Sequence, residues 1–493
     1  MQSTSVVGFN CFESLLTASR TCEFFYNITS THQIVPNNDG QFYFIQFPPT
    51  ISQTMTTETL STQRIQTTEP IQQAVQAFWP FDNSAKDLYG NYNSLGMNSV
   101  EYSNLSITGH GSSLLCSSDR AVNMNSPLNI VNSSFTFELW INIKSYTSSW
   151  WLGIMGQCWS QKENQCLHIA TRNKVSYFGF FNNDCSGTTQ LKVATWYHLS
   201  FVYDAVNNLQ LIYLNGVLEC MRSSVDPLLI TSPIPPLTIG MITLYANFYF
   251  NGMLDQISFV NRAKSEREIL RDATLIAQYS FDYNSSLDFG PNKINGSTLN
   301  VSFITDGRVN DALFFAQNNN GSYFLARDLV LLGVPNKPFS ISMWLRPSSS
   351  NNTGIIVYLD TQSASNWCMP ILGFTVSGQL IAQNTQAGRT INVTGPTLPV
   401  GVWTHVVYVY SIARRLLLYV NGTYISATVV FSRNTPNSPI NLYIGNCPLG
   451  NQCHCSVGSI APKQYYGAID EFQVYSRELS VNDIENLSNL SNI

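Results

Sequence analysis

The sequence predicts an all-β protein built from two tandem antiparallel β-sandwiches of the jelly-roll type, preceded by a poorly structured N-terminal segment. Three observations lead to this prediction: short segments of alternating apolar and polar residues, bends rich in Gly, Pro and Asn between them, and an internal repeat of slightly more than 200 residues. Alternation places one face of a strand in a core, and many short strands separated by turns are typical of sandwiches and jelly rolls. A chain of 493 residues is long enough for two such cores.

The residues before the repeat divide into two parts. Residues 1–47 contain Cys11, Cys22 and several aromatic residues, and the sequence assigns them no fold. Residues 48–75 are rich in Thr, Ser and Gln, which predicts a flexible linker. The start lacks the basic and apolar regions of a signal peptide, so we expect the sequence to be part of a longer secreted or membrane protein.

Each copy of the repeat, over residues 76–273 and 274–493, opens with a short strand that ends in Phe-Asp. A turn containing Asp, Gly and Asn follows, at residues 87–91 and 288–292. The next long strand alternates between apolar and polar positions, so one of its faces is predicted to lie in the core. The apolar positions are Phe135, Phe137, Leu139 and Ile141 in the first copy and Phe339, Ile341, Met343 and Leu345 in the second.

The central hairpin is the clearest match between the two copies. Residues 196–203 (WYHLSFVY) correspond to residues 403–410 (WTHVVYVY), and each is followed by a second apolar strand. Those strands end in Asn215-Gly216 and Asn421-Gly422, and Asn-Gly favours the positive φ angles of a type I′ turn. Each copy closes with a Gly-x-x-Asp strand, after which apolar residues at helical spacing predict a short helix near residues 265–272 and 480–486.

This order of motifs resembles the laminin-G-like jellyroll family of the concanavalin-A-like lectin/glucanase superfamily. The resemblance rests on Phe-Asp, Phe-x4-Trp, Trp-x-His-x4-Tyr, Asn-Gly, Ile-Gly and Gly-x-x-Asp, in the same order in both copies. It implies a sandwich of two curved antiparallel sheets in each copy. It also implies a recognition or adhesion module for glycans or protein partners, often with calcium, although a fold does not by itself fix a ligand.

Composition indicates an extracellular protein. Only 11% of the residues are charged, against about 25% in typical soluble domains, and Asn, Ser and Thr supply the polar surface. Eleven cysteines suggest oxidising conditions. A net charge of −5 without a basic cluster makes nucleic acid an improbable partner, and no apolar run of about 20 residues could insert into a bilayer. Twelve Asn-x-Ser/Thr sequons are present, at Asn27, Asn104, Asn132, Asn284, Asn295, Asn300, Asn320, Asn351, Asn392, Asn421, Asn486 and Asn489.

The sequence predicts no catalytic residue. Glucanases of this superfamily use closely spaced carboxylates on one strand, and the chain contains no Glu-x-Asp. It also lacks a Gly-x-Ser-x-Gly elbow, a P-loop and a His-Glu-x-x-His motif. His198 and His405 recur without an acid or nucleophile at a recurring neighbouring position, which favours a structural role.

Calcium is a candidate cofactor. The first and last strands of each copy are expected to be neighbours, so an aspartate from each could supply hard oxygen ligands to one ion. The alternative is that these aspartates cap turns or accept hydrogen bonds from backbone amides. The candidate residues are Asp82 with Asp255 in the first copy, Asp282 with Asp470 in the second, and the turn residues Asp87 and Asp288.

Glycan binding would require exposed aromatic rings that stack on sugars. Candidate residues are the loop tryptophans Trp150, Trp151 and Trp159 in the first copy and Trp367 in the second. The alternative is that these side chains pack the loops. Four other tryptophans recur in register and are predicted to lie in the cores: Trp140, Trp196, Trp344 and Trp403.

The cysteines are predicted to form disulfides. Cys158 and Cys166 are close enough in sequence to close a hairpin, whereas the Cys447-x5-Cys453-His454-Cys455 segment could bind zinc instead. Disulfides are favoured there in a secreted protein, and the odd total leaves one cysteine over. The disulfide candidates are Cys11, Cys22, Cys158, Cys166, Cys185, Cys220, Cys447, Cys453 and Cys455.

These features together predict a non-catalytic extracellular recognition or adhesion protein that binds glycans or glycoproteins. The first alternative is a structural role, in which the pair of sandwiches spaces other domains of a longer surface protein. The second alternative is an accessory region of a carbohydrate-active enzyme.

Overall fold

A computed structural model shows two separate units, Met1–Gln72 and Gln73–Ile493. In the first unit it describes the backbone of four strands. In the second it describes residues 76–493 except for 95–99, 119, 147–150, 230–232, 244–246, 318–320, 350–352, 362–366, 387–388, 434, 449–454, 456–457 and 490–493. The predicted linker, residues 48–75, lies outside the described residues.

The first unit contains two antiparallel hairpins. Strand β1 (Val6–Glu13) pairs with β2 (Arg20–Ile28), and β3 (His32–Pro36) pairs with β4 (Phe42–Gln46). Cys11 and Cys22 occupy directly opposite backbone positions on the first hairpin. The segment that the sequence left without a fold therefore contains regular strands.

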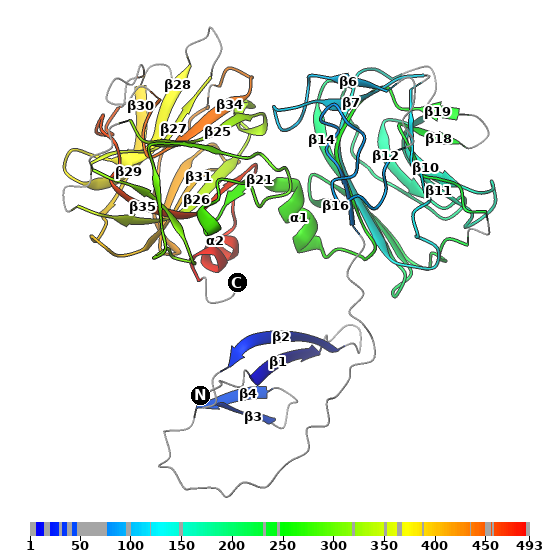
Figure 1. Ribbon diagram of the computed structural model, residues 1–493, viewed down its shortest axis with the longest axis horizontal. Coiled ribbons are helices and arrows are strands. Elements are labelled where there is room, and N and C mark those ends of the chain that lie inside the picture. Colours follow the sequence, from blue (N-terminus) through cyan, green and yellow to red (C-terminus); the bar gives the residue numbers. More distant parts are fainter. Residues whose placement is uncertain are drawn as a thin grey trace, which may run out of the picture. The chain divides into compact units, whose positions relative to one another are not determined.

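The first sandwich consists of two antiparallel sheets (Figure 1). One, the β9 sheet, has the order β16-β15-β14-β9-β20-β7-β6, with β5 also paired to β20; the other, the β10 sheet, has the order β13-β12-β11-β10-β17-β8. The β9 sheet comprises β5 (Gln76–Trp79), β6 (Glu101–Ser103), β7 (Ser113–Cys116), β9 (Phe135–Ile143), β14 (Trp196–Asp204), β15 (Leu209–Leu214), β16 (Val217–Arg222) and β20 (Gly252–Val260). The β10 sheet comprises β8 (Val122–Asn123), β10 (Trp151–Cys158), β11 (Cys166–Arg172), β12 (Val175–Gly179), β13 (Asp184–Ser186) and β17 (Thr238–Ile239).

The second sandwich repeats this topology. Its β26 sheet has the order β23-β24-β35-β26-β31-β32-β33, with β21 paired to β35, and its β27 sheet has the order β22-β25-β34-β27-β28-β29-β30. The β26 sheet comprises β21 (Leu275–Tyr279), β23 (Ser302–Ile304), β24 (Ala312–Phe315), β26 (Phe339–Pro347), β31 (Thr404–Tyr410), β32 (Leu416–Val420), β33 (Thr423–Ala427) and β35 (Gly467–Tyr475). The β27 sheet comprises β22 (Ser297–Leu299), β25 (Tyr323–Leu329), β27 (Gly354–Asp360), β28 (Cys368–Phe374), β29 (Gln379–Gln386), β30 (Arg389–Thr397) and β34 (Ile440–Ile444).

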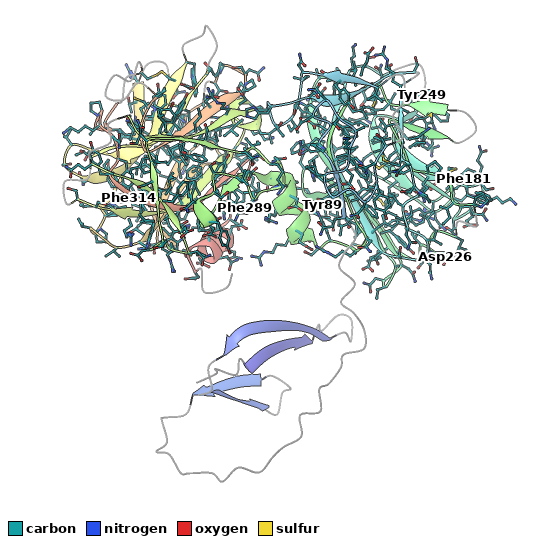
Figure 2. All side chains as sticks on the ribbon, in the orientation of Figure 1. Tyr89, Phe181, Asp226, Tyr249, Phe289 and Phe314 are labelled. Atoms are coloured by element: carbon teal, nitrogen blue, oxygen red, sulfur yellow. A yellow bond between two sulfur atoms is a disulfide. The ribbon has the colours of Figure 1, made fainter. Side chains whose placement is uncertain are left out.

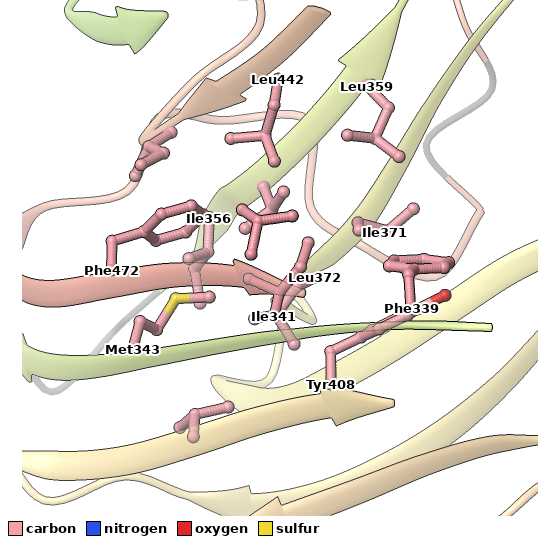
Figure 3. Packing of buried hydrophobic residues seen from close by; sticks show 14 of the residues in the cluster. Phe339, Ile341, Met343, Ile356, Leu359, Ile371, Leu372, Tyr408, Leu442 and Phe472 are labelled. Atoms are coloured by element: carbon pink, nitrogen blue, oxygen red, sulfur yellow. The ribbon is translucent and has the colours of Figure 1, made fainter. Parts of the chain in front are cut away.

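The predicted apolar faces form the two cores. All four predicted positions on β9 are fully buried, and their counterparts on β26 are buried as well. Figure 3 shows the second core, where Phe339, Ile341 and Met343 from β26 lie among apolar side chains that include Leu359 and Leu442 of the β27 sheet. Burial of apolar surface between the sheets is the main stabilising contribution in such a sandwich. The all-β prediction is confirmed.

Turns and caps follow the sequence signals. Asn215 and Gly216 adopt φ angles of 50° and 82°, and Asn421 and Gly422 adopt 47° and 74°, as a type I′ turn requires. The two predicted helices are present as α1 (Glu266–Thr274) and α2 (Val481–Ser488). Each begins with a capping box, in which a serine and an acid three residues later satisfy free backbone amides. Short 3₁₀ turns occur at Asp282–Asn284 and Leu331–Gly333.

Candidate functional site

Polar and aromatic side chains gather on the outer face of the β10 sheet. Leu152, Ile169 and Phe178 point into the core, and because side chains alternate across a strand, their neighbours point outward. Four adjacent strands thereby bring together five side chains, which we call the Trp151 cluster: Trp151 from β10, His168 and Arg172 from β11, Tyr177 from β12 and Asp184 from β13.

Arg172 holds the aromatic part of the cluster together. Its guanidinium carbon lies 5.1 Å from the centre of the Trp151 ring and 5.3 Å from that of Tyr177, within the range of a cation–π contact. The two rings meet edge to face at 5.0 Å, and Arg172 Nη1 also donates to the Tyr177 hydroxyl at 3.2 Å. Trp151 and Arg172 are only half-buried, so part of this surface faces solvent.

The acid of the cluster keeps one oxygen without a hydrogen bond. The Tyr177 hydroxyl donates to Asp184 Oδ2 at 2.9 Å. His168 Nδ1 lies 3.1 Å from the Cys166 carbonyl, which assigns the proton to Nδ1, because burial lowers the pKa of His168 and keeps the ring neutral. Nε2, 3.6 Å from Asp184 Oδ1, then has no proton to donate, and Oδ1 finds no donor among the described residues.

A hairpin borders the cluster. Strands β18 (Met241–Thr243) and β19 (Asn247–Tyr249) lie beside β10 (Figure 1). Gly153 and Gly156 on β10 make this approach possible, since a Cβ on Gly153 would lie 2.2 Å from the Phe248 carbonyl oxygen. Phe248 reaches the cluster, with its ring centre 6.0 Å from that of Trp151. Phe181, labelled in Figure 2, packs against the same small apolar cluster as Trp151 and Phe248.

A cavity of about 300 Å³ lies outside the β9 sheet. Its walls include Glu138, Trp140, His198, Lys264 and Asp272, together with Tyr89 and Phe289, which are labelled in Figure 2. Lys264 pairs with Glu138 and also with Asp272, the latter at 2.9 Å. Burial raises the pKa of Glu138 to about 7 even beside Lys264. No sequence motif pointed to this site, because a single glutamate in an alternating strand is not a motif.

The aspartates of the first and last strands come near each other in both copies, as predicted. Each pair is close enough for the neighbouring charge to raise the pKa of the buried partner, Asp82 acting on Asp255 and Asp282 on Asp470, although burial is the larger cause in both. Asp255 accepts hydrogen bonds from Ser106 Oγ at 2.8 Å and from two backbone amides.

The remaining two aspartates lie within their own turns. Asp87 accepts from the amides of residues 78, 89, 91 and 92, at 2.8 to 3.0 Å. Asp288 accepts from the amides of residues 278, 290 and 294, at 2.7 to 2.8 Å. These are the contacts of a turn cap. Calcium, which prefers six to eight oxygen ligands, would have to compete with them, and it stays a prediction.

The candidate tryptophans separate in the structure. Trp151 belongs to the cluster described above, whereas Trp159 lies in the turn after β10 and is 37% exposed. Trp367 packs partly buried against the core of the second sandwich. Trp150 lies outside the described residues. Only Trp151 therefore joins a group of polar and aromatic side chains in the part of the chain that is described.

Three disulfides join cysteines that are both among the described side chains: Cys158–Cys166, Cys185–Cys220 and Cys368–Cys455. Cys368 was not among the candidates, since nothing in its local sequence points to a partner 87 residues away. Cys447 is also disulfide-bonded, whereas Cys453 lies outside the described residues. Cysteines in disulfides are not thiolate ligands, which contradicts the zinc alternative for Cys447 and Cys455. Cys116 is a buried free thiol.

Two absences concern the described residues alone. They contain no group of three or more His, Cys, Asp or Glu side chains arranged to hold a metal ion. They also contain no helix with the length and apolarity that crossing a bilayer requires.

Several solved structures are similar to this chain. Domain 4 of an extracellular arabinanase from Geobacillus stearothermophilus, in complex with arabinotriose, is 20% identical over 44% of this chain and 98% of its own, with a TM-score of 0.30. Domains LG4-5 of the mouse laminin alpha1 chain are 11% identical over 73% of this chain and 88% of their own, with a TM-score of 0.25. A heptameric pentraxin from Limulus polyphemus is 17% identical over 36% and 80%, with a TM-score of 0.27.

Sequence comparison gives two further results. No curated protein matches the chain. A laminin G family model, described as "Concanavalin A-like lectin/glucanases superfamily", matches residues 117–270 and 318–485. Each matched range lies within one of the two sandwiches, so the family match and the duplicated topology coincide.

Proposed function

This chain belongs to the laminin G family of the concanavalin A-like lectin/glucanases superfamily, and from that premise we propose that it is a non-catalytic extracellular recognition protein that binds glycans. The Trp151 cluster is the proposed binding surface. Protein partners that carry glycans would be recognised by the same surface.

The observation that carries the proposal is the composition of the Trp151 cluster. Glycan sites combine an aromatic surface, which packs against the apolar face of a sugar ring, with polar groups that read its hydroxyls. Half-buried Trp151 supplies the first feature, and Arg172 and Asp184 supply donors and an acceptor beside it. Asp184 Oδ1 finds no donor among the described residues and is itself buried, so it can accept from a sugar hydroxyl only after the side chains around it move.

Features of the surface support an extracellular setting. The exposure of nine of the predicted sequon asparagines is described, and all nine are exposed, whereas the asparagines that are buried among the described residues belong to no sequon. The disulfides are a second feature, because they persist mainly in oxidising compartments.

A glycan array with the intact chain tests the proposal. We expect reproducible binding to a defined set of sugars, and about tenfold weaker binding after Trp151→Ala, because the ring contact is lost. Trp159→Ala is the matched control, since Trp159 is an exposed tryptophan of the same sandwich outside the cluster, and it should bind as the wild type does. A blank array, or equal loss in both variants, would contradict the proposal.

Two accompanying proposals have separate tests. Glycanase turnover in an assay panel would contradict the non-catalytic role.

If calcium bridges Asp82 and Asp255, EDTA should lower the melting temperature, since an ion at 100 times its Kd stabilises a fold by about 2.7 kcal/mol. Asp82→Asn should then remove the EDTA effect, and an unchanged melting temperature in the wild type would assign these aspartates to backbone anchoring alone.

A structural spacer is the second candidate function. Ile107 and Trp140 of the first sandwich belong to the same buried apolar cluster as Ile276 of the second, and α1 ends at Thr274 directly before β21 begins. The shared apolar cluster and the direct passage from α1 to β21 favour two sandwiches that are held rigidly together. A blank array combined with a single unfolding transition for both sandwiches would favour this function over recognition.

A further inference from the structure

The second sandwich contains a buried arginine without an acidic partner. Arg433 lies between β33 and β34 and is 1% exposed. Its guanidinium carbon lies 4.4 Å from the centre of the Phe339 ring, which stands beside Tyr408 in the core (Figure 3). Every Asp and Glu of residues 275–493 is among the described residues, and the charged or ionisable groups that act on Arg433 are two tyrosines, Tyr408 and Tyr410.

The Arg433 guanidinium donates hydrogen bonds to described residues through only one of its edges. Arg433 Nη1 donates to the Leu332 carbonyl at 2.8 Å. Nε and Nη2 find no acceptor among the described residues. These two nitrogens form the side-on edge of a guanidinium, with parallel N–H bonds that suit a single acceptor. Burial lowers the pKa of Arg433 to about 10, so the group remains charged at neutral pH.

The first sandwich fills the equivalent region with apolar side chains. Strand register makes Ala382 equivalent to Phe178 and Asn384 equivalent to Phe180. Phe178 and Phe180 are fully buried and pack against each other. In the second sandwich a smaller apolar residue, Ala382, and a buried amide, Asn384, take their places. Asn384 Nδ2 donates to the Tyr408 hydroxyl at 3.3 Å, and Tyr408 is one of the two tyrosines that act on Arg433.

We infer that the Nε–Nη2 edge of Arg433 binds a small monovalent inorganic anion of the chloride class inside the second sandwich. An unpaired buried charge is strongly unfavourable, and a guanidinium cannot avoid this by losing its proton. A single negative charge neutralises the side chain. The 1% exposure excludes organic anions and peptides, and the Leu332 carbonyl on the opposite edge makes a second negative charge unfavourable.

Thermal unfolding of the intact chain in sodium chloride and in sodium gluconate at equal ionic strength tests the inference. We expect chloride to raise the melting temperature saturably, by about 2–4 °C, and bromide to act like chloride. Arg433→Met should remove this difference. Arg414→Met is the matched control, because exposed Arg414 donates to Ser432 in the neighbouring loop, and it should keep the difference.

The opposite results are equally clear. Equal melting temperatures in chloride and gluconate, or a chloride effect that persists in Arg433→Met, would overturn the inference. Should Arg433→Met fail to fold, crystals of the wild type grown in sodium bromide decide the matter. An anomalous bromide peak at the Nε–Nη2 edge supports the site, and its absence rejects it.

Discussion

At the scale of single residues, Asp255 and Asp470 perform the same task in the two copies. Each lies fully buried on the last strand, and each accepts two hydrogen bonds from a preceding loop, residues 106–107 and 308–309. The next residue, Gln256 or Glu471, adopts a φ of 48° at a bulge, and its amide returns to the aspartate. A left-handed residue without glycine is unfavourable, so the aspartate contacts stabilise this bulge in both copies.

Glu471 should make stability depend on pH. Burial, with the nearby Asp470 and Asp282 carboxylates, raises its pKa from 4.5 to about 7. The fold therefore favours protonated Glu471. The stability that this protonation contributes is complete below pH 4.5 and is lost as the pH rises through 7. In urea unfolding, Glu471→Gln should have a free energy of unfolding about 1–3 kcal/mol higher than that of the wild type at pH 8. At pH 4.5 the two free energies should be nearly equal.

The control for this prediction is Glu485→Gln. Glu485 is an exposed acid on α2 of the same sandwich, so its loss should leave the pH profile parallel to that of the wild type. The same difference between Glu471→Gln and the wild type at both pH values would rule out the titration of Glu471 as the cause.

At the scale of elements, the hairpin β18–β19 depends on a glycine in the strand beneath it. A Cβ at Gly153 would lie 2.2 Å from a carbonyl oxygen of β19 and 2.5 Å from an amide of β18. Backbone atoms cannot yield as a flexible side chain can, so Gly153→Ala should displace the hairpin. We expect a loss of about 1–3 kcal/mol in the free energy of unfolding, measured by denaturant titration.

Gly156→Ala serves as the matched variant for this element. Gly156 lies on the same strand, and its nearest neighbour would be 3.2 Å from a Cβ, so a shift of a few tenths of an ångström relieves the contact. Its loss of stability should be clearly smaller. Equal losses of unfolding free energy in Gly153→Ala and Gly156→Ala would contradict the close packing of the hairpin on β10.

At the scale of the whole molecule, the surface carries few charges and many glycosylation signals. Expression through a eukaryotic secretory pathway should therefore yield a protein whose mass falls after enzymatic removal of N-glycans, with occupancy mapped by mass spectrometry. Nine sequon asparagines are exposed in the fold, so a glycan on each can extend into solvent without disturbing the sandwiches. An unmodified protein from such cells would contradict an extracellular route.

The sequence by itself determined most of the architecture. Alternation fixed which side chains of β9 and β26 enter the cores, and Asn-Gly fixed the turns at residues 215 and 421, because both signals act between residues that are close along the chain. The repeat identified the second sandwich from the first. The helices after each last strand followed from apolar spacing, whereas the caps at Ser265 and Ser480 were seen only in the structure.

Only the tertiary structure decided which distant side chains meet. Trp151, Tyr177 and Asp184 are 33 residues apart at the extremes, and Cys368 lies 87 residues from Cys455; no local pattern links them. In the sequence Arg433 cannot be told from an exposed loop residue, and only the packing of the second sandwich shows that it is buried. Burial, partners and free hydrogen-bonding edges are properties of the space around a side chain. That space is set by how the two sheets close over each other.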